Sequence, residues 1–515
     1  MNITHSSQRG ALACLSLCVL LSSLGTSIAN VALPELARAF GVSFQQVQWV
    51  VLAYLLAVTS LVVGVGRLGD LIGKRRLLLA GILLFSLASL ASGLASFRGL
   101  LAARALQGLG AAAMLTLAMA FVADVAPKAQ TGRAMGWLGS MSAVGTALGP
   151  SLGGALIAAW GWPAIFLFNA PLGAAVFLLA RRSLPADAST ARASRFDYAG
   201  ALLLALTLSA YALAMTLGRG RFGPQNLAWL LAAAIGVAAF LRVEARGAAP
   251  LVRIAMLRDP ALSGPLIAAA LVATVMMGTL VVGPFHLSRA LGLDAMGAGL
   301  AMSMGPAISM LAGVPAGRLA DRFGAKRVSL AGLAAMLAGA ALLAALPASL
   351  GVAGYLAPLA ALTVGYALFQ AANNTLVMAG QPADRRGLVS GLLNLARNLG
   401  LVTGAAALGA VFAAAAGGPI ADARPEAVAW ATRAVFAVSA LLMAAALLAL
   451  LALRRGRWAG LAPLERGPSR RPRHFGLIRP ALSEPARAPA GIARQPLQIV
   501  GAGAKTGTRA PGAGE

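Results

Sequence analysis

The sequence has few charged residues, and acidic residues are especially scarce. Of its 515 residues, 11% are charged, 15 are Asp or Glu, and 59% are hydrophobic. Soluble domains usually carry about 25% charged residues, so a water-soluble fold of this length could not bury so much apolar surface. Together with a mean hydropathy of +0.81, the composition indicates a polytopic membrane protein.

Residues that build catalytic or metal centres are also scarce. There are three histidines and two cysteines, Cys14 and Cys18, which lie in the first apolar stretch. Two thiols do not complete a zinc site, so we interpret them as small buried hydrophobic residues. No cluster of acids, His and Cys and no Walker A sequence is present. We therefore expect no enzyme, no metal and no cofactor.

The net charge of +27 does not indicate nucleic-acid binding. The Lys and Arg residues lie between apolar stretches and in the C-terminal tail, and no basic groove with interleaved aromatic residues is present. The expected surroundings are instead a lipid bilayer.

The apolar runs are long and do not alternate, which favours helices over a β-barrel. A helix crosses the hydrocarbon core with about 20 residues. The sequence predicts fourteen spans, near residues 11–34, 48–66, 77–96, 100–123, 135–159, 163–180, 197–217, 226–242, 262–285, 296–317, 328–346, 352–374, 388–415 and 431–453.

The distribution of Lys and Arg predicts the orientation. With a cytoplasmic N-terminus, most of these residues fall in inner loops, as the positive-inside rule requires. Both termini are then cytoplasmic, in a multi-pass protein of the cytoplasmic membrane. The first apolar stretch also has features of a signal peptide. Because it runs on to Pro34, we interpret it as an uncleaved first span.

A charged phrase occurs twice: GRLGDLIGKRR at 66–76 and GRLADRFGAKR at 317–327. Each copy follows the second span of a six-span unit if two spans are inserted between the units, and repeated units are common in transporters. We expect a six-helix bundle at 1–182, a linker with two extra spans at 183–258, a second bundle at 259–455, and a disordered basic tail at 456–515.

The phrase allows two interpretations. It could be only a positive-inside turn, but its recurrence favours a gating role in both halves. Glycines permit tight turns and close helix approach, and the first carboxylate could accept helix N-terminal amides or a guanidinium. The gating candidates are Gly66, Asp70, Gly73, Arg75, Gly317, Asp321, Gly324 and Arg327.

At these residues the sequence resembles the major facilitator superfamily, whose signature loop is similar to 66–76. Arg104 in ARALQGLGAAA is similar to its fourth-span motif, and GTALGPSLGG at 145–154 to the fifth-span motif of antiporters. LGTSIANVALP at 24–34, with fourteen spans, resembles the drug:proton antiporter branch that exports multiple drugs. The resemblance covers residues 10–453.

The resemblance implies an exporter whose fifth span forms a seam between two rocking halves. The residues of this antiporter-type motif are Gly145, Gly149, Pro150, Gly153 and Gly154. Ordinary close helix packing explains the same small residues, and a proline bends a helix. We expect Gly149→Leu to block the motion.

Two arginines lie within spans, where a charge costs about 2.5–3.5 kcal/mol. Arg104 either snorkels to the outer surface or takes a coupling role, as the resemblance implies. Arg397, near the middle of its span, either forms interior hydrogen bonds or acts in function. Gln107 and Asn30 are further polar candidates for transport or coupling. For His286, at the outer end of span nine, we expect interfacial anchoring.

The chain departs from the resembled family at Gly25, where that family usually has a mid-membrane aspartate. None of the fifteen acids lies deep in a span. This favours neutral or anionic substrates over strongly cationic ones. Proton coupling then needs another group, either Glu35, Asp124 or a proton on the substrate; both acids could instead be interfacial.

The sequence therefore predicts a secondary active transporter that exports small molecules by alternating access with proton coupling. Two alternatives stay open: an uptake symporter for a small anionic or neutral metabolite, and a membrane sensor that does not transport. The expected partners are a small-molecule substrate, protons and the bilayer. We expect a monomer, and accessory efflux proteins are possible further partners.

Overall fold

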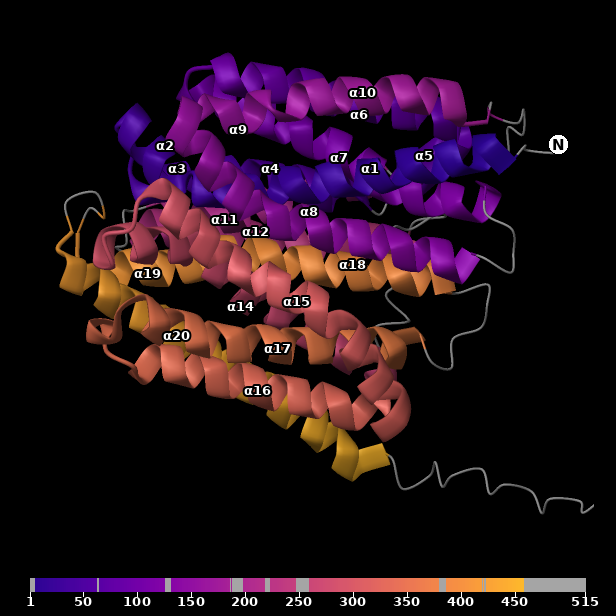
Figure 1. The fold of residues 1–515 in the computed structure, drawn as a ribbon. Helices are drawn as coiled ribbons and strands as arrows, with labels where there is room; N and C mark the ends of the chain where they lie inside the picture. Colours follow the sequence, from indigo (N-terminus) through magenta and orange to yellow (C-terminus); the bar gives the residue numbers. More distant parts are fainter. Residues whose placement is uncertain are drawn as a thin grey trace, which may run out of the picture. The chain divides into compact units, whose positions relative to one another are not determined.

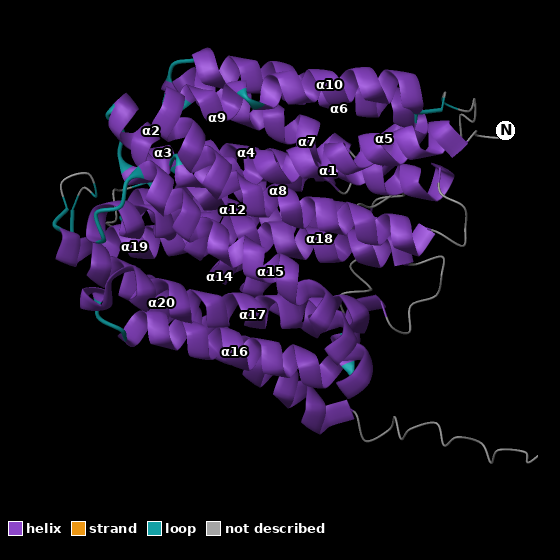
Figure 2. Cartoon of the chain, in the orientation of Figure 1, coloured by secondary structure: helices purple, strands orange, loops and turns teal. Residues whose placement is uncertain are grey.

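The computed structural model describes residues 5–62, 64–125, 131–185, 187, 198–217, 223–246, 259–378, 386–418, 420 and 423–457. Among these residues every regular element is a helix, and Figure 2 draws no strand in them. Fourteen helical stretches are long and apolar enough to cross a membrane. The predicted all-α fold with fourteen spans is therefore confirmed. The predicted tail at 456–515 lies outside the described residues, apart from its first two positions.

The first eight spans come from helices that follow one another closely along the chain. In order, these helices are α1 (His5–Val31), α2 (Leu33–Phe40), α3 (Phe44–Val47), α4 (Trp49–Val62), α5 (Val65–Ile72), α6 (Lys74–Leu94), α7 (Phe97–Val125), α8 (Thr131–Trp160), α9 (Pro163–Leu167), α10 (Asn169–Ser183), α11 (Tyr198–Thr216) and α12 (Pro224–Arg246).

The last six spans include two π-helical turns, η2 and η4. A short 3-10 turn, η3, comes directly before the fourth of these spans. In order, these elements are α14 (Pro260–Phe285), η2 (His286–Ala290), α15 (Ala295–Phe323), α16 (Ala325–Ala345), η3 (Ala348–Leu350), α17 (Gly351–Met378), α18 (Arg386–Thr403), η4 (Gly404–Leu408), α19 (Gly409–Ala415) and α20 (Pro425–Arg457).

The predicted span boundaries lie within a few residues of the helices, with one informative difference. Span one was predicted to reach Pro34, but α1 ends at Val31 and the separate helix α2 begins at Leu33. Pro34 sits in the first turn of α2, where its missing N–H costs nothing. Glu35 therefore lies in the first turn of a separate short helix, outside span one as predicted.

We call spans one to six the N-terminal half and spans nine to fourteen the C-terminal half. In the first, α1 packs against α7, α8 and α10; in the second, α14 packs against α18 and α20. Between the halves, α8 packs against α15 and α4 against α18, while the inserted α11 contacts α4 and η4 (Figure 1). The elements from both halves thus meet along two seams.

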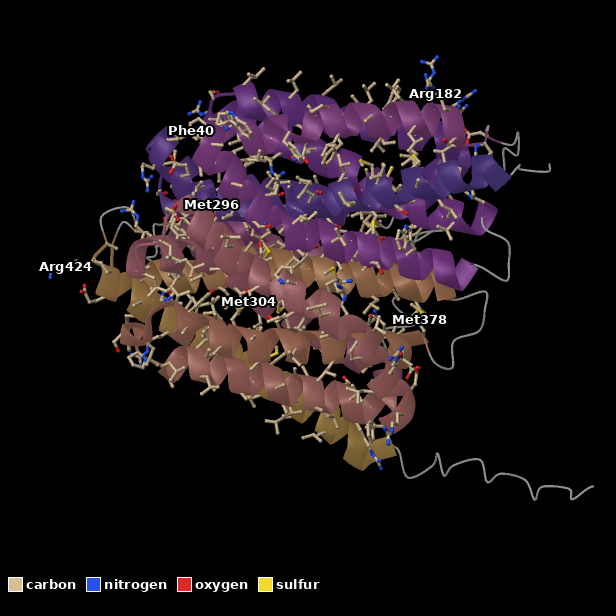
Figure 3. The ribbon with its side chains drawn as sticks, viewed as in Figure 1. Phe40, Arg182, Met296, Met304, Met378 and Arg424 are labelled. Atoms are coloured by element: carbon tan, nitrogen blue, oxygen red, sulfur yellow. The ribbon has the colours of Figure 1, made fainter. Side chains whose placement is uncertain are left out.

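The two ends of the helices can be followed from labelled side chains. Figure 3 shows Phe40 and Arg182 at opposite ends of the N-terminal half. We call the end with Phe40 the predicted outer end and the end with Arg182 the predicted inner end, after the orientation that the Lys and Arg distribution predicts.

Candidate functional site

Arg104 lies in the interior of the N-terminal half and is completely buried. Its Nε donates to the carbonyl oxygen of Val50 at 2.9 Å, and its Nη1 donates to that of Gly25 at 3.1 Å. Nη1 also donates to Oε1 of Gln107, one turn further along α7. Snorkelling to the surface is therefore wrong for Arg104, which ties α7 to α1 and α4.

Further polar contacts extend this network. The amide nitrogen of Gln107 donates to the hydroxyl of Ser89 on α6 at 2.6 Å. The guanidinium of Arg104 lies 4.4 Å from the ring centroid of Tyr54, whose hydroxyl donates to the carbonyl oxygen of Ser22. No acidic side chain pairs with Arg104 among the described residues, so the guanidinium keeps its positive charge uncompensated by a neighbouring carboxylate.

Gly25 and Asn30 occupy different surroundings on α1. A Cβ atom at Gly25 would lie 3.0 Å from the Phe85 ring and 3.9 Å from the Tyr54 hydroxyl, so a side chain there would enter the Arg104 network. Asn30 is buried, and its amide donates to the carbonyl oxygen of Thr26 on its own helix at 3.0 Å. Its Oδ1 is buried and accepts no hydrogen bond from the described residues.

Arg397 on α18 is the second arginine within a span, and it is partly buried. Its Nη2 donates to the hydroxyl of Tyr366 on α17 at 3.5 Å, which is longer than the usual range of about 2.7–3.2 Å. The other nitrogens of its guanidinium make no hydrogen bond with the residues that the structure describes. Arg397 is thus much less saturated with partners than Arg104.

Glu35, one of the two acids considered for proton coupling, does not enter this interior. Glu35 lies on α2 and forms an ion pair with Arg38, with 2.7 Å between Oε2 and Nη1. Its side chain is 35% exposed, as an interfacial acid would be. The side chain of Asp124 lies outside the described residues.

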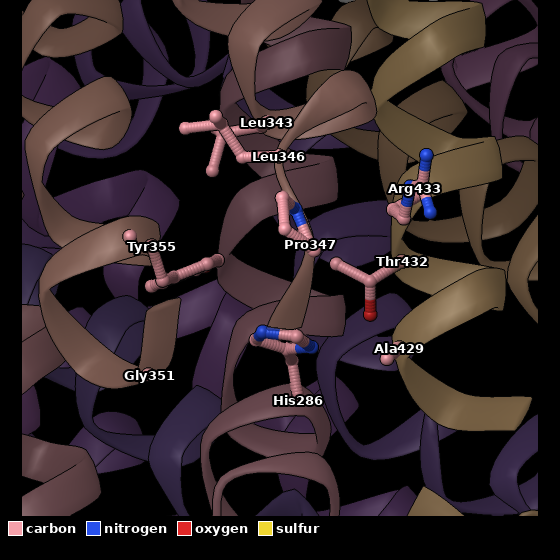
Figure 4. Close-up of a pocket in the computed structure, with 10 residues that line it drawn as sticks. His286, Leu343, Leu346, Pro347, Gly351, Tyr355, Ala429, Thr432 and Arg433 are labelled. Atoms are coloured by element: carbon pink, nitrogen blue, oxygen red, sulfur yellow. The ribbon is translucent and has the colours of Figure 1, made fainter. Parts of the chain in front are cut away.

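His286 differs from its prediction as an interfacial anchor. It is 7% exposed, at the start of η2, and its ring centroid lies 5.0 Å from that of Tyr355. Figure 4 shows it in a small recess at the ends of α16, α17 and α20, near Thr432 and Arg433. The recess holds about 30 Å³, enough for one or two water molecules. Interfacial anchoring is therefore wrong, because neighbouring helices cover the ring.

The glycines of the fifth-span motif pack mainly inside the N-terminal half. A Cβ atom at Gly149 would lie 1.9 Å from Oγ of Ser27 on α1, and Gly145 and Gly153 also face α1. Only Gly154 faces the other half, where its Cβ would lie 2.5 Å from the carbonyl oxygen of Ala295 on α15. The predicted seam is therefore wrong for three of the four glycines, because the face that they share packs on α1.

Close approach through glycine recurs at two further places, whose glycines the sequence analysis did not single out. At the contact between α8 and α15, a Cβ atom at Gly299 would collide with the carbonyl oxygen of Pro150. In the C-terminal half, Gly400 and Gly404 face carbonyl oxygens of α14 just as Gly145 and Gly149 face α1. The shared spacing of four residues, GTALG and GLVTG, was the available signal for a second repeat.

The repeated charged phrase contains one turn in each half. Gly73 and Gly324 have φ angles of 104° and 88°, a region that side chains disfavour, so the predicted tight turns are confirmed there. Gly66 and Gly317 instead lie inside α5 and α15 with open space around them, so neither a turn nor close packing explains them.

A residue outside the phrase holds the first turn. Asp187 accepts hydrogen bonds from the backbone N–H groups of Arg75 at 2.7 Å and Arg76 at 3.2 Å, in the first turn of α6. The sequence analysis assigned such a role to Asp70, whose side chain lies outside the described ones. In the second copy, Asp321 and Arg327 are exposed. The two turns therefore differ in what stabilises them.

At the predicted outer end, the halves touch through an aromatic cluster and one hydrogen bond. The Phe44 ring lies 4.8 Å from that of Phe285 and 5.1 Å from that of Phe412. The amide nitrogen of Gln48 donates to the carbonyl oxygen of Ala405 at 3.0 Å. Because Phe44 and Gln48 belong to the N-terminal half and the other three residues to the C-terminal half, these contacts join the halves.

Comparison with known proteins identifies similar chains. The sequence profile described as Major Facilitator Superfamily matches residues 15–405. Multidrug resistance protein Stp of Mycobacterium tuberculosis is 34% identical over 403 residues, which cover 76% of this chain and 73% of Stp. Riboflavin transporter RibZ of Clostridioides difficile is 28% identical over 396 residues, which cover 77% of this chain and 86% of RibZ.

Solved structures show the same fold. The crystal structure of a bacterial homologue of the human lysosomal transporter Spinster, in an inward-facing and unoccupied conformation, matches with a TM-score of 0.64 and 17% sequence identity. The match covers 88% of this chain and 98% of that one. At this identity the likeness concerns the arrangement of helices alone.

Proposed function

The chain belongs to the major facilitator superfamily, and from this membership we propose that it is a secondary active exporter of small molecules. It works by alternating access in the cytoplasmic membrane, with both termini in the cytoplasm and protons as the coupling ion. The proposal divides the chain into two six-helix bundles, 1–182 and 259–455, and an inserted pair of spans within 183–258. The family and the relatives favour transport over catalysis.

The observation that carries this proposal is the set of contacts between the halves at the predicted outer end. Gly154 meets Ala295, Phe44 meets Phe285, and Gln48 reaches across to η4. Contacts of this kind close one end of a pathway between two halves, as alternating access requires. Export as the direction is supported by the name of Stp, a multidrug resistance protein.

Proton coupling has a restricted choice of groups. With Gly25 in place of a mid-membrane acid, the proton is carried by Glu35 or by the substrate itself. The ion pair between Glu35 and Arg38 can be broken when the carboxylate takes up a proton, because the neutral acid no longer attracts the guanidinium. A substrate proton needs no such group.

Transport into everted membrane vesicles tests the proposal. Vesicles that contain the full chain receive a panel of cationic, neutral and anionic fluorescent compounds, with and without a pH gradient. We expect accumulation of at least one compound to stop when an uncoupler collapses the gradient. An unchanged rate would contradict proton coupling, accumulation only in right-side-out vesicles would indicate uptake, and no flux of any compound would indicate a sensor. Vesicles without the protein serve as the control.

A further inference from the structure

We propose that Arg397, with Tyr366, binds the carboxylate of a small organic anion, and that this is the substrate class of the exporter. The inference rests on the proposed function and adds a site to it. Arg397 is suitable because its guanidinium is partly accessible and poorly satisfied, whereas that of Arg104 is completely buried and bound to two carbonyls and an amide.

The direction of the Arg397 side chain follows from the face of the α18–η4 segment on which it lies. Gly404 faces α14, where its Cβ would lie 2.3 Å from the carbonyl oxygen of Thr274. Arg397 lies seven residues earlier, about two helical turns, and so shares this face of the segment. Its bond to Tyr366 on α17 agrees with this direction. The guanidinium therefore points into the C-terminal half, away from surrounding lipid.

Other polar side chains lie on the same two helices at matching positions. Asn394 precedes Arg397 by three residues on α18, and Gln370 follows Tyr366 by four residues on α17, spacings that place side chains on one helix face. All four are partly buried. The amides of Gln370 and Asn394 make no hydrogen bond with other described residues, so their donors are available to a ligand.

The positive charge of Arg397 makes this group of four polar side chains suitable for an anion. No acid pairs with Arg397 among the residues that the structure describes. A guanidinium presents parallel N–H groups that match the two oxygens of a carboxylate. One cation, a phenol hydroxyl and two amides suit a single carboxylate better than a multiply charged phosphate. The predominantly apolar helices around them suit an organic body on that carboxylate.

Binding of a matched pair of probes tests the site. Dansyl-glycinate carries a carboxylate on an aromatic body, and dansyl-glycinamide is its neutral counterpart. Using the purified full-length protein in detergent, we expect the carboxylate to bind roughly tenfold more tightly or better, as charge-assisted hydrogen bonds allow. Arg397→Gln should abolish this preference, and Arg397→Lys should restore part of it.

Two further variants protect the test against simple unfolding. Tyr366→Phe removes one hydroxyl and should weaken carboxylate binding by a few-fold without affecting the amide probe. Arg98→Gln removes a positive charge from an exposed position at the start of α7 and should leave the preference unchanged. Equal affinity of the wild-type protein for both probes, no saturable binding of dansyl-glycinate, or an undiminished preference in Arg397→Gln would overturn the proposal.

The outcomes also separate this inference from the proposed function. Binding that depends on Arg397 without flux in vesicles would contradict export and leave the anion site standing. Proton-driven flux of other compounds, together with no preference for dansyl-glycinate, would contradict the anion site and leave the exporter standing.

Discussion

The guanidinium of Arg104 lies over the ring of Tyr54, 4.4 Å from its centroid, in the interior of the N-terminal half. Tyr54 comes from α4 and Arg104 from α7, and each also reaches a carbonyl oxygen of α1. The pair therefore joins three spans. A buried arginine with this many contacts stabilises the half in which it lies.

Replacing Arg104 with Leu should destabilise the protein. The substitution removes the hydrogen bonds that Arg104 donates to the carbonyl oxygens of Val50 and Gly25 and to Gln107, and a hydrogen bond from a charged group is worth about 1.5–3 kcal/mol. We expect a clearly lower thermal unfolding midpoint in detergent. Arg98→Gln, on the same helix but exposed, is the matched control and should unfold at the wild-type temperature. Equal midpoints for both variants would contradict a structural role for Arg104.

Introducing an acid at Gly25 should change the preference for charge. A Cβ atom there lies between the Phe85 ring and the Tyr54 hydroxyl, so a carboxylate at this position comes close to Arg104 and offsets its charge. Loss of one positive charge about 10 Å from a ligand changes binding by roughly tenfold at an effective dielectric constant of 20.

We therefore expect Gly25→Asp to increase ethidium transport in everted vesicles. Gly25→Asn, which has almost the same shape and no charge, should stay at the wild-type rate. If both variants behave alike, the charge of the interior does not select the substrate.

Substituting two glycines of α8 should have different consequences. A Cβ at Gly154 meets Ala295 of the other half, whereas a Cβ at Gly149 meets Ser27 within the same half. We expect Gly154→Val to fold normally but to transport at least roughly tenfold more slowly, because the predicted outer end cannot close. Gly149→Val should lower the unfolding midpoint. Transport assays and thermal unfolding of both proteins distinguish the two effects, and a wild-type transport rate for Gly154→Val would rule out a role in closure.

Asp187 should stabilise the first turn of α6. It accepts two backbone hydrogen bonds there, and loss of a helix N-cap costs about 1 kcal/mol. We expect Asp187→Ala to increase proteolytic cleavage near Gly73 and to lower the unfolding midpoint slightly. Asp187→Asn, which can still accept a hydrogen bond, should show a smaller effect. Asp321→Ala, at an exposed position in the second copy, serves as the control and should show none.

The interior contacts were only partly predictable. A charge within a span suggested that Arg104 faces the interior, since exposure to lipid is costly. Its acceptors, the carbonyls of Val50 and Gly25, belong to residues with no polar side chain, so no sequence pattern marks them. His286 was misplaced because its position at the end of a span gives no information about the helices that cover it.

The sequence by itself determined the fourteen apolar spans, the two glycine turns at Gly73 and Gly324, and the absence of a mid-span acid. These features follow from the local composition and from the spacing of residues along the chain. A run of about 20 apolar residues suffices for a span, and a glycine suffices for a backbone conformation that other residues disfavour. The tertiary structure alone decided which face of α8 meets α1, which carboxylate reaches the start of α6, and which of the two arginines within spans is completely buried. Those contacts join segments up to hundreds of residues apart, and only their packing selects among the many pairings that the same residue types allow.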